Sequence, residues 1–524
     1  MAPSFVHRFA PLHALTVHWR AGGNVPHGYW LTRFVLLRFL GLVYCVAFLA
    51  GANQLVPLIG HGGLLPADSY LQRLADHFGS PASGFIEVPT LFWIGISDRG
   101  LVAVAWVGAA ISLIVLAGYA NSLMMAALWV LYTSIVNIGQ LWYSYGWEIQ
   151  LLETGFLAIF LCPLIDWRPF PNCAPPFVVL WLYRWLIFRI MIGAGLIKMR
   201  GDACWRDLTC LYYHYETQPI PNPLSWWLHF RPHWFHQAGT LWNHLIELPA
   251  PWFAFGPRTC RHVAGILMVG FQVVLILSGN LSFLNWLTII PCLACFDDTF
   301  WARILPDSLV QRALRAGENA KRSDAQMFAA VSLAFVVAVL SIEPVVNLIS
   351  PGQVMNTSFN RLNLVNTYGA FGSVGRERNE IIFEGTDSSS PDGAVWREYE
   401  FKAKPGNPRR MPPLIAPYHL RLDWQIWFAA MSTPQQYPWT VHFVWKLLHN
   451  DPGTLSLLAG NPFPAAPPRY IRAVLYRYRF TRPEEADGSW WKRESLGEWL
   501  PPLSADDPAI RRFLSEQGWL ILDP

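Results

Sequence analysis

Long apolar runs dominate residues 29–350, whereas polar and apolar positions alternate over shorter distances in the rest of the chain. A helix needs about 20 mostly apolar residues to cross the hydrocarbon core of a bilayer. About nine segments approach that length: 32–50, 91–118, 122–139, 150–165, 177–197, 240–255, 263–278, 281–296 and 327–348. The fourth of these is short, and prolines interrupt the sixth. The pattern predicts a multi-pass helical membrane bundle over residues 29–350.

Residues 351–524 have the pattern of a water-soluble domain. Strand-forming residues alternate with polar ones at 380–402, around a polar turn, and again at 469–481. Residues 424–431 and 441–449 have the character of helices. We therefore predict a compact, β-rich, sandwich-like domain after a mainly α membrane bundle.

The composition supports the same boundary. Charged residues make up 14% of the 524 residues, against about 25% in a typical soluble domain. Residues 1–350 contain 37 charged side chains and residues 351–524 contain another 37, so the charge density doubles near position 350. The net charge is only +4 and no run of Lys or Arg forms a basic stripe, so we expect no nucleic-acid partner.

Basic residues in the loops predict the orientation of the bundle, because cytoplasmic loops are enriched in Lys and Arg. The loop at 297–325 contains five of them in 29 residues and is predicted to be cytoplasmic. Residues 1–28 lack the short apolar core of a cleavable signal peptide, so we predict a cytoplasmic N-terminal segment before a retained first span. With an odd number of spans, residues 351–524 then lie outside the cytoplasm.

Charged side chains within the predicted spans are candidates for function, since a charge in hydrocarbon costs at least about 2.5 kcal/mol and must pair or act. Glu148 and Glu153 enter the fourth span, and Arg184 and Arg189 cross the fifth. The first interpretation is mutual neutralisation of Glu and Arg between neighbouring helices. The alternative is a polar cavity that opens outward, with Lys198 at its rim as a base.

The stretch at 193–227 combines several of these features. Lys198, Asp202 and Arg206 are spaced four apart, so they share one face and form a charge relay if the fifth helix continues. The alternative is that Lys198 and Arg206 only anchor the helix at the level of the lipid headgroups. The candidate catalytic residues are Lys198, Glu148, Glu153 and His214.

All eight cysteines lie in the first 300 residues, and the C-terminal domain contains none. Cys204 and Cys210 share the outer loop after the fifth span, where they form either a local disulfide or two free thiols. Cys292 and Cys295 lie in an apolar span, where small buried side chains are expected. Five of the 15 histidines lie between positions 214 and 244, but we expect aromatic packing there and neither a metal site nor a cofactor.

Several long strings resemble one known family. They are GHGGLLPA from residue 60, YGWEIQLLETGF from 145, HYETQPIPNPLSWW from 214, NTYGAFGSVGRERNEIIFEGT from 366, PYHLRLDWQIWFAAM from 417 and NPFPAAPPRYIRAVLYRYRFT from 461. Through them the chain resembles the lipase maturation factor family over nearly its whole length. The resemblance implies a multi-pass membrane protein that assists the folding and assembly of secreted lipases such as lipoprotein lipase. In animals, members reside in the endoplasmic reticulum with the C-terminal domain in the lumen.

The resemblance also implies that client proteins bind the C-terminal domain. We expect this domain to present exposed aromatic side chains to them. The candidate client-binding residues are Trp424, Trp427 and Phe428. Short cytoplasmic loops and a bias toward Ala, Arg, Pro and Trp indicate a bacterial-type member, which predicts an inner-membrane protein with a periplasmic C-terminal domain. The expected partners are secreted client proteins and membrane lipid.

A second, shorter similarity supports the alternative function. The string GAGLIKMRGDACW, at 193–205, is similar to a segment of vitamin K-dependent gamma-glutamyl carboxylases that contains the catalytic lysine. Lys198 falls at the first of two adjacent lysine positions of that motif, and Met199 falls at the second. The main hypothesis is therefore a membrane-embedded folding factor that acts by binding. The alternative is an integral-membrane enzyme with Lys198 as its base.

Overall fold

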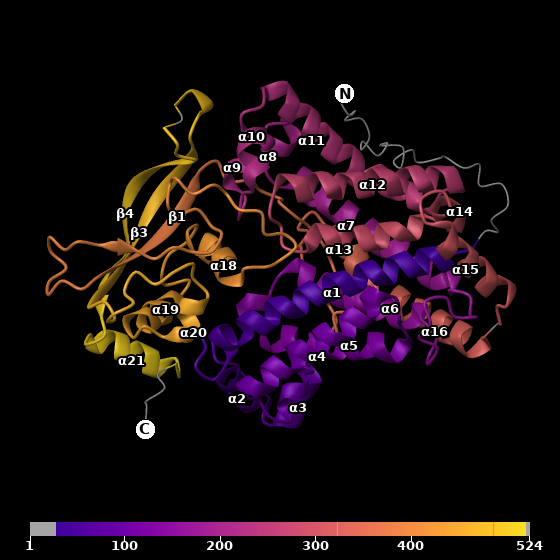
Figure 1. Ribbon diagram of the computed structural model, residues 1–524, viewed down its shortest axis with the longest axis horizontal. Helices are drawn as coiled ribbons and strands as arrows, with labels where there is room; N and C mark the ends of the chain where they lie inside the picture. Colours follow the sequence, from indigo (N-terminus) through magenta and orange to yellow (C-terminus); the bar gives the residue numbers. More distant parts are fainter. Residues whose placement is uncertain (1–27, 322, 486, 520–524) are drawn as a thin grey trace, which may run out of the picture.

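The computed structural model describes residues 28–321, 323–485 and 487–519. A helical body formed by residues 30–349 lies beside a smaller domain that contains a four-stranded sheet (Figure 1). The protein is thus mainly helical, with one small antiparallel sheet toward its C-terminus. The predicted cytoplasmic segment at 1–28 lies outside the described residues, except for Gly28.

Five described helical segments are long and apolar enough to cross a membrane. They are α1 (Trp30–Ile59), α4 (Asp98–Ala117), α7 (Phe177–Arg200), α12 (Arg258–Ser278), and the nearly continuous pair α16 (Asp324–Leu340) and α17 (Ile342–Ile349). Shorter helices of the body are α5 (Ser122–Ile138), α6 (Gly146–Leu161), α11 (His233–Glu247) and α13 (Leu284–Cys292), the last continued by η5 (Leu293–Cys295).

The predicted count of about nine spans is therefore not confirmed. The segment at 240–255 is divided between α11 and the 3-10 turn η4 (Ala250–Phe255), because Pro249 and Pro251 lack the backbone N–H group that a continuous helix needs. The segment at 91–118 begins with the separate turn η2 (Leu91–Trp93), and its long helix starts only at Asp98.

Short helices connect the long ones. They are α2 (Ala67–Phe78), α3 (Pro81–Glu87), η3 (Gln140–Tyr143), α8 (Ala203–Arg206), α9 (Leu211–Thr217), α10 (Pro223–His229), α14 (Asp298–Trp301) and α15 (Asp307–Glu318). Helices α8 to α10 lie toward the sheet domain, whereas α14 and α15 lie at the opposite end of the body (Figure 1).

Helix α1 is the central element of the body and packs against α4, α5, α6 and α13. Its close approach to α4 depends on small residues: a Cβ atom at Gly41 would lie 2.7 Å from the backbone nitrogen of Leu116. A Cβ atom at Gly108 of α4 would lie 2.4 Å from atoms of the Phe48 ring. Small residues are usual at crossings of membrane helices, where association depends on close van der Waals packing.

The sheet has the strand order β2-β1-β3-β4, and every neighbouring pair is antiparallel. Its strands are β1 (Arg378–Thr386), β2 (Arg397–Glu398), β3 (Tyr470–Phe480) and β4 (Trp491–Ser504). The predicted hairpin at 380–402 and the predicted strand at 469–481 are confirmed. The helices of this domain are α18 (Arg421–Ala429), α19 (Trp439–Leu448), α20 (Pro452–Ser456) and α21 (Pro508–Glu516), with the turn η6 (Pro483–Glu485).

The sandwich prediction is wrong, because the described residues form a single sheet and helices take the place of a second one. Helix α18 packs on β1, and α19 packs on β3 and β4. The ring of Phe443 in α19 lies 5.0 Å from that of Phe383 in β1, measured between centroids. The domain is therefore an antiparallel sheet covered by helices.

Buried polar contacts join the sheet domain to the helical body, and we call this contact region the seam. Arg378 of β1 donates hydrogen bonds to three carbonyl oxygens of residues 216–219. The side chain of Gln54 in α1 bonds the backbone at His419 and Arg421. The seam also includes Glu148 and Glu153 of α6 and the segment 366–368, which are described below.

Arg421→Gln is expected to lower the free energy of unfolding by about 3–5 kcal/mol, because it leaves Glu148 buried without its cation. The two side chains are fully buried, with Arg421 Nη1 at 2.8 Å from Glu148 Oε1. Denaturant unfolding of the full chain in detergent measures the change. As a control, Arg397→Gln breaks the exposed pair with Asp387 and is expected to cost at most about 1 kcal/mol. Equally small effects of both variants would show that the seam is not a main source of stability.

Candidate functional site

Glu148, on the first turn of α6, is held by the C-terminal domain. Its Oε1 atom accepts a hydrogen bond from Arg421 Nη1, and its Oε2 atom accepts one from the hydroxyl of Tyr132. The Arg421 guanidinium also lies over the ring of Tyr143, 3.4 Å from the centroid. Burial, together with the charge of Arg421, lowers the pKa of His419 well below its ordinary value, so this histidine stays neutral beside the ion pair.

Glu153 forms an ion pair with Arg189 of α7, and both side chains are buried. Its Oε2 atom also accepts hydrogen bonds from the backbone N–H of Asn366 at 3.1 Å and from the hydroxyl of Tyr368 at 2.6 Å. Arg189 Nη1 donates to the carbonyl oxygen of Asn366 at 2.7 Å. The predicted neutralisation of Glu and Arg on neighbouring helices is thus confirmed for Glu153 and Arg189, and the chain that follows the last apolar helix completes it.

Arg184 has no carboxylate partner among the described residues, contrary to the prediction. Its guanidinium donates to the carbonyl oxygen of Ala294 at 2.9 Å and to the hydroxyl of Tyr29 at 3.0 Å. It also lies 5.5 Å from the ring centroid of Phe177 and 5.7 Å from that of Trp181. A carbonyl dipole and aromatic faces therefore take the place of the expected carboxylate.

Lys198, on the last turn of α7, is 4% exposed and forms an ion pair with Glu247 of α11. Its Nζ atom also donates to Asn243 Oδ1 at 3.1 Å and lies 5.0 Å from the ring centroid of Trp205. The lysine is therefore enclosed by partners from α11 and α8 and does not stand at the rim of an open cavity.

The predicted relay of Lys198, Asp202 and Arg206 is wrong, because α7 ends before Asp202. Asp202 pairs instead with Arg376 of the C-terminal part at 2.9 Å. Arg206 donates to the carbonyl oxygen of Met199 at 2.7 Å. The three side chains thus have separate partners.

His214 is buried, and its ring lies 4.8 Å from that of Phe371. Burial, and after it the charge of Lys198, lowers the pKa of His214 to about 4. This histidine is therefore neutral at physiological pH. Glu148, Glu153 and Lys198 each have their own ionic partner. The four candidate catalytic residues are engaged in separate buried contacts rather than gathered around one reacting group.

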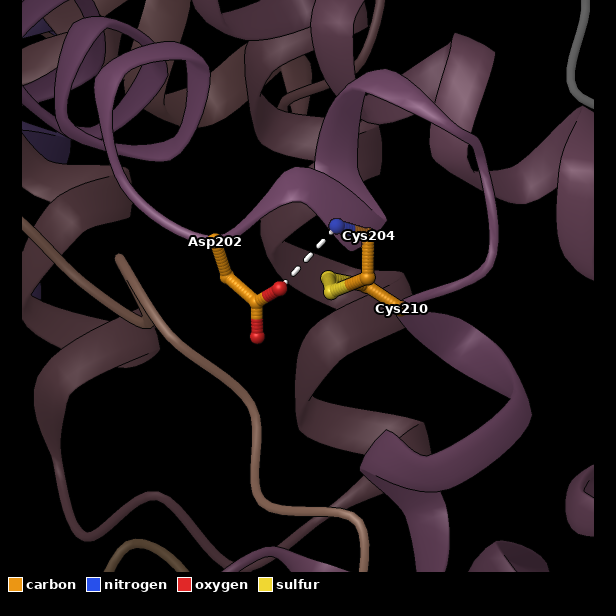
Figure 2. Close-up of side chains that lie close together, drawn as sticks. All are labelled: Asp202, Cys204 and Cys210. Atoms are coloured by element: carbon orange, nitrogen blue, oxygen red, sulfur yellow. Dashed lines mark hydrogen bonds between the residues drawn. A yellow bond between two sulfur atoms is a disulfide. The ribbon is translucent and has the colours of Figure 1, made fainter.

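Cys204 and Cys210 are joined as a disulfide, with Cα atoms 4.7 Å apart (Figure 2). Asp202 lies beside them, and its Oδ1 atom accepts a hydrogen bond from the backbone N–H of Cys204 at 3.0 Å. The three side chains lie close enough together to hold a metal ion. However, two sulfurs bonded to each other are not thiolate ligands. The bond closes the loop between α8 and α9, so we assign it a structural role.

The candidate client-binding residues lie at the seam rather than on an exposed face. Trp424 is 4% exposed, and its ring centroid lies 5.0 Å from that of Trp147. Trp427 donates its indole N–H to a carbonyl oxygen of α9 at 3.2 Å. Phe428 is half-buried and lies 6.3 Å from the ring of Tyr145. Phe428 also lines a cavity.

This cavity opens at the seam and has a volume of about 560 Å³; we call it the seam cavity. The helical body contributes one charged side chain, Arg73, together with Leu65, Gln140, Leu141, Ser144 and Tyr145. The C-terminal domain contributes Gln425, Phe428, Gln436, Tyr437, Pro438, Trp439, Gln517 and Trp519. Amide groups and aromatic rings face one space, which is the usual lining of a pocket for a mainly apolar ligand with a few polar contacts. Of the lining residues, the sequence pointed to Phe428 alone, because the two walls are far apart in the chain and share no motif.

Lys198→Met is expected to lower the free energy of unfolding by about 3–5 kcal/mol, because Glu247 would stay buried without a cation. Adding Glu247→Gln removes that charge, so we expect the double variant to recover most of the loss. Denaturant unfolding of the single and double variants in detergent measures both effects. A double variant as unstable as the single one would show that the ion pair is not the cause.

Residues 31–303 match the lipase maturation factor transmembrane domain, and residues 364–501 match the lipase maturation factor C-terminal domain. Lipase maturation factor 1 of Bos taurus is 52% identical over 522 residues, which cover 95% of this chain and 92% of the relative. Lipase maturation factor 2 of Xenopus laevis is 30% identical over 605 residues, which cover 93% and 84%. No solved structure matches the chain. Because both domains match in order and the similarity spans almost the whole chain, the protein belongs to the lipase maturation factor family.

Proposed function

We propose that this protein assists the folding and assembly of secreted lipases from within a membrane. The observation that carries the proposal is the match of both domains, and of 95% of the chain, to proteins named lipase maturation factor. We further propose that residues 351–524 form the extracytoplasmic domain, in the lumen of the endoplasmic reticulum or in a bacterial periplasm. Secreted proteins fold in those compartments.

Action by binding is supported by the placement of the charged residues. The four candidate catalytic side chains are used in separate buried contacts, and the matched relatives give no support to the carboxylase alternative. Lys198 in particular is engaged by Glu247 and Asn243, so it is not free to act as a base. We therefore assign it to the stability of the helical body.

The seam cavity supplies a binding surface of suitable chemistry for a client. Glutamine amides pair with the N–H and C=O groups of an extended chain, and aromatic rings contact its apolar side chains. Gln425 is itself fixed by hydrogen bonds from its Nε2 atom to Leu141 O at 2.7 Å and to the Tyr145 hydroxyl at 2.9 Å. A wall held in this way loses little conformational entropy on binding. We propose that an exposed segment of an incompletely folded client enters this cavity.

The orientation is tested by a reporter. Helix α15, which contributes Arg312 and Arg315 to the Lys- and Arg-rich loop 297–325, lies at the opposite end of the body from the sheet domain (Figure 1), and this supports a cytoplasmic α15 and an extracytoplasmic sheet. Alkaline phosphatase fused after Pro524 is expected to be active, because its disulfides form only outside the cytoplasm. The same enzyme fused after Glu318 is expected to be inactive. The opposite pair of results would invert the topology.

Ser144→Trp tests the seam cavity, because Ser144 lines it with an exposed side chain whose replacement fills space without opening the core. In cells that lack their own maturation factor, we expect the unaltered chain to restore secretion of active lipoprotein lipase. The variant is expected to restore about tenfold less secreted lipase activity, which corresponds to a loss of about 1.4 kcal/mol in the free energy of client binding. Its melting temperature is expected to be unchanged.

The matched control is Ser389→Trp, on the exposed turn between β1 and β2, which is expected to act normally. Full activity of Ser144→Trp would exclude the cavity as the client site but leave the family function intact. Failure of the unaltered chain to restore any lipase would contradict the proposed function itself.

A further inference from the structure

Helices α7 and α12 begin at the same end of the helical body. The ring of Phe177, at the start of α7, lies 5.7 Å from that of Tyr29, the residue before α1, and Asp298 of α14 caps the start of α1. Arg258, at the start of α12, pairs at 3.1 Å with Asp297, which caps α14. Both helices therefore begin at the end of the body that carries α14, away from the sheet domain (Figure 1).

Both helices end on the side of the sheet domain. Just after α7, the backbone N–H of Asp202 donates to the carbonyl oxygen of Gly372 at 2.9 Å. At the end of α12, the carbonyl oxygen of Ser278 accepts a hydrogen bond at 3.0 Å from Gln218, which follows α9. Each helix is long and apolar enough to cross a membrane. Because α7 and α12 run in the same direction, the chain between them, residues 201–257, must return from one end of the body to the other.

Helix α11 and the turn η4 make this return along α7. Their contacts move from the last turn of α7 toward its start. The pairs are Glu247 with Lys198, Leu248 with Gly195, Trp252 with Phe188 and Phe255 with Trp181. Trp181 and Lys198 are 17 positions apart, which is about 25 Å along a helix that rises 1.5 Å per residue. The hydrocarbon core of a bilayer is about 30 Å thick, so the return covers most of a membrane's depth.

The exposed side of this return is apolar, and its polar side chains are buried. Every exposed residue between positions 238 and 257 is apolar, and the large ones are Leu241, Trp242, Leu245, Trp252 and Phe253. In the same stretch Thr240, Asn243 and Glu247 are buried. A helix on a water-facing surface has the reverse arrangement. Polar groups that point inward and apolar groups that point outward are typical of a helix surrounded by lipid.

Polar residues reappear at the surface on both sides of this stretch. Gln237 is exposed before it and Thr259 after it. Between them the apolar face is continuous with α12, because η4 packs on α12 and α12 exposes Ile266, Val273 and Val274. Helix α12 is among the described helices that are long and apolar enough to cross a membrane, so its exposed side faces hydrocarbon. The same surroundings therefore cover α11 and η4.

We propose that α11 and η4 together cross the bilayer as one broken element, and that their exposed side contacts the acyl chains of the lipid. Pro249 and Pro251 break the helix, and irregular backbone is tolerated at membrane depth where protein covers it. Ala250, Pro251 and Ala254 are buried, so the broken part of the element is covered in this way.

The proposal also accounts for the paired charges beside the break. Lys198 and Glu247 lie where α11 passes the last turn of α7, and their pairing leaves no net charge at this depth. The proposal requires that α7 and α12 span a membrane. It does not depend on lipase clients, nor on which side of the membrane is cytoplasmic.

The crossing is tested with thiols at its two ends. Cys260 is an exposed native cysteine in the first turn of α12, and Gln237→Cys adds one before the apolar stretch. A membrane-impermeant maleimide is added to sealed vesicles from cells that express the full chain. Both proteins carry Cys173→Ser, and the Gln237→Cys variant also carries Cys260→Ser. We expect the reagent to label only one of the two thiols until detergent opens the vesicles, because the bilayer separates them.

The matched control is Ser389→Cys, on the exposed turn of the sheet domain and in the same cysteine background, which is expected to be labelled from the same side as Gln237→Cys. Labelling of Cys260 and Gln237→Cys from one side would overturn the crossing. An inverted orientation would exchange the two sides but keep the thiols opposite, so it would support the crossing and contradict only the proposed topology.

Lipid contact is tested by placing the photoreactive residue p-benzoylphenylalanine at Phe253 of the full chain in phosphatidylcholine vesicles. Mass spectrometry after illumination is expected to find a phosphatidylcholine adduct. The same replacement at Val395, an exposed position of the sheet domain, is expected to give none. An adduct with a second copy of the chain instead of lipid, or no adduct in a protein that melts normally, would overturn the lipid contact.

Discussion

Charged groups buried between the two parts of the chain control how this protein is assembled. Glu148 and Glu153 belong to α6 in the helical body, but Arg421 and Asn366, from the C-terminal part, complete their contacts. A carboxylate in low-dielectric surroundings is costly without its partner. The helical body and the sheet domain are therefore stable as a joined pair, and the walls of the seam cavity are defined only once they are joined.

The joined state also shapes the end of the body near the sheet. A cavity with amide and aromatic walls lies there between the two parts of the chain. Lys198, Glu148, Glu153 and His214 are used in separate buried contacts, so these four side chains form no single cluster.

Local composition was enough to predict the long apolar helices and the strands β1 and β3, because apolar runs and alternation are properties of short segments. Strand β4 was missed because Pro501 and Pro502 argue against a strand, although an edge strand tolerates proline. The sandwich was predicted from the alternating strand patterns, which do not show whether a second sheet or covering helices such as α19 lie on the sheet. In the site, the Glu153–Arg189 pair was predictable from charges in neighbouring spans. The partner of Glu148 was not, because it comes from another domain. The end of α7 lies close to the predicted end of the fifth span at residue 197, and the helix does not continue as the charge relay required. Gly201 lies so close to the carbonyl oxygen of Gly372 that a Cβ atom would be 2.2 Å from it, a contact with a segment far away in the chain.

The pairing of Glu148 with Arg421 also imposes an order in time. The two residues are 273 positions apart, so at roughly 5–20 residues per second a ribosome makes the carboxylate tens of seconds before its cation. During that interval α6 must keep Glu148 protonated, hydrated or at the edge of the membrane. A chain that stops before α18 never leaves that state. A factor that helps other proteins to mature thus has a waiting step in its own biogenesis, which ends when its last third docks.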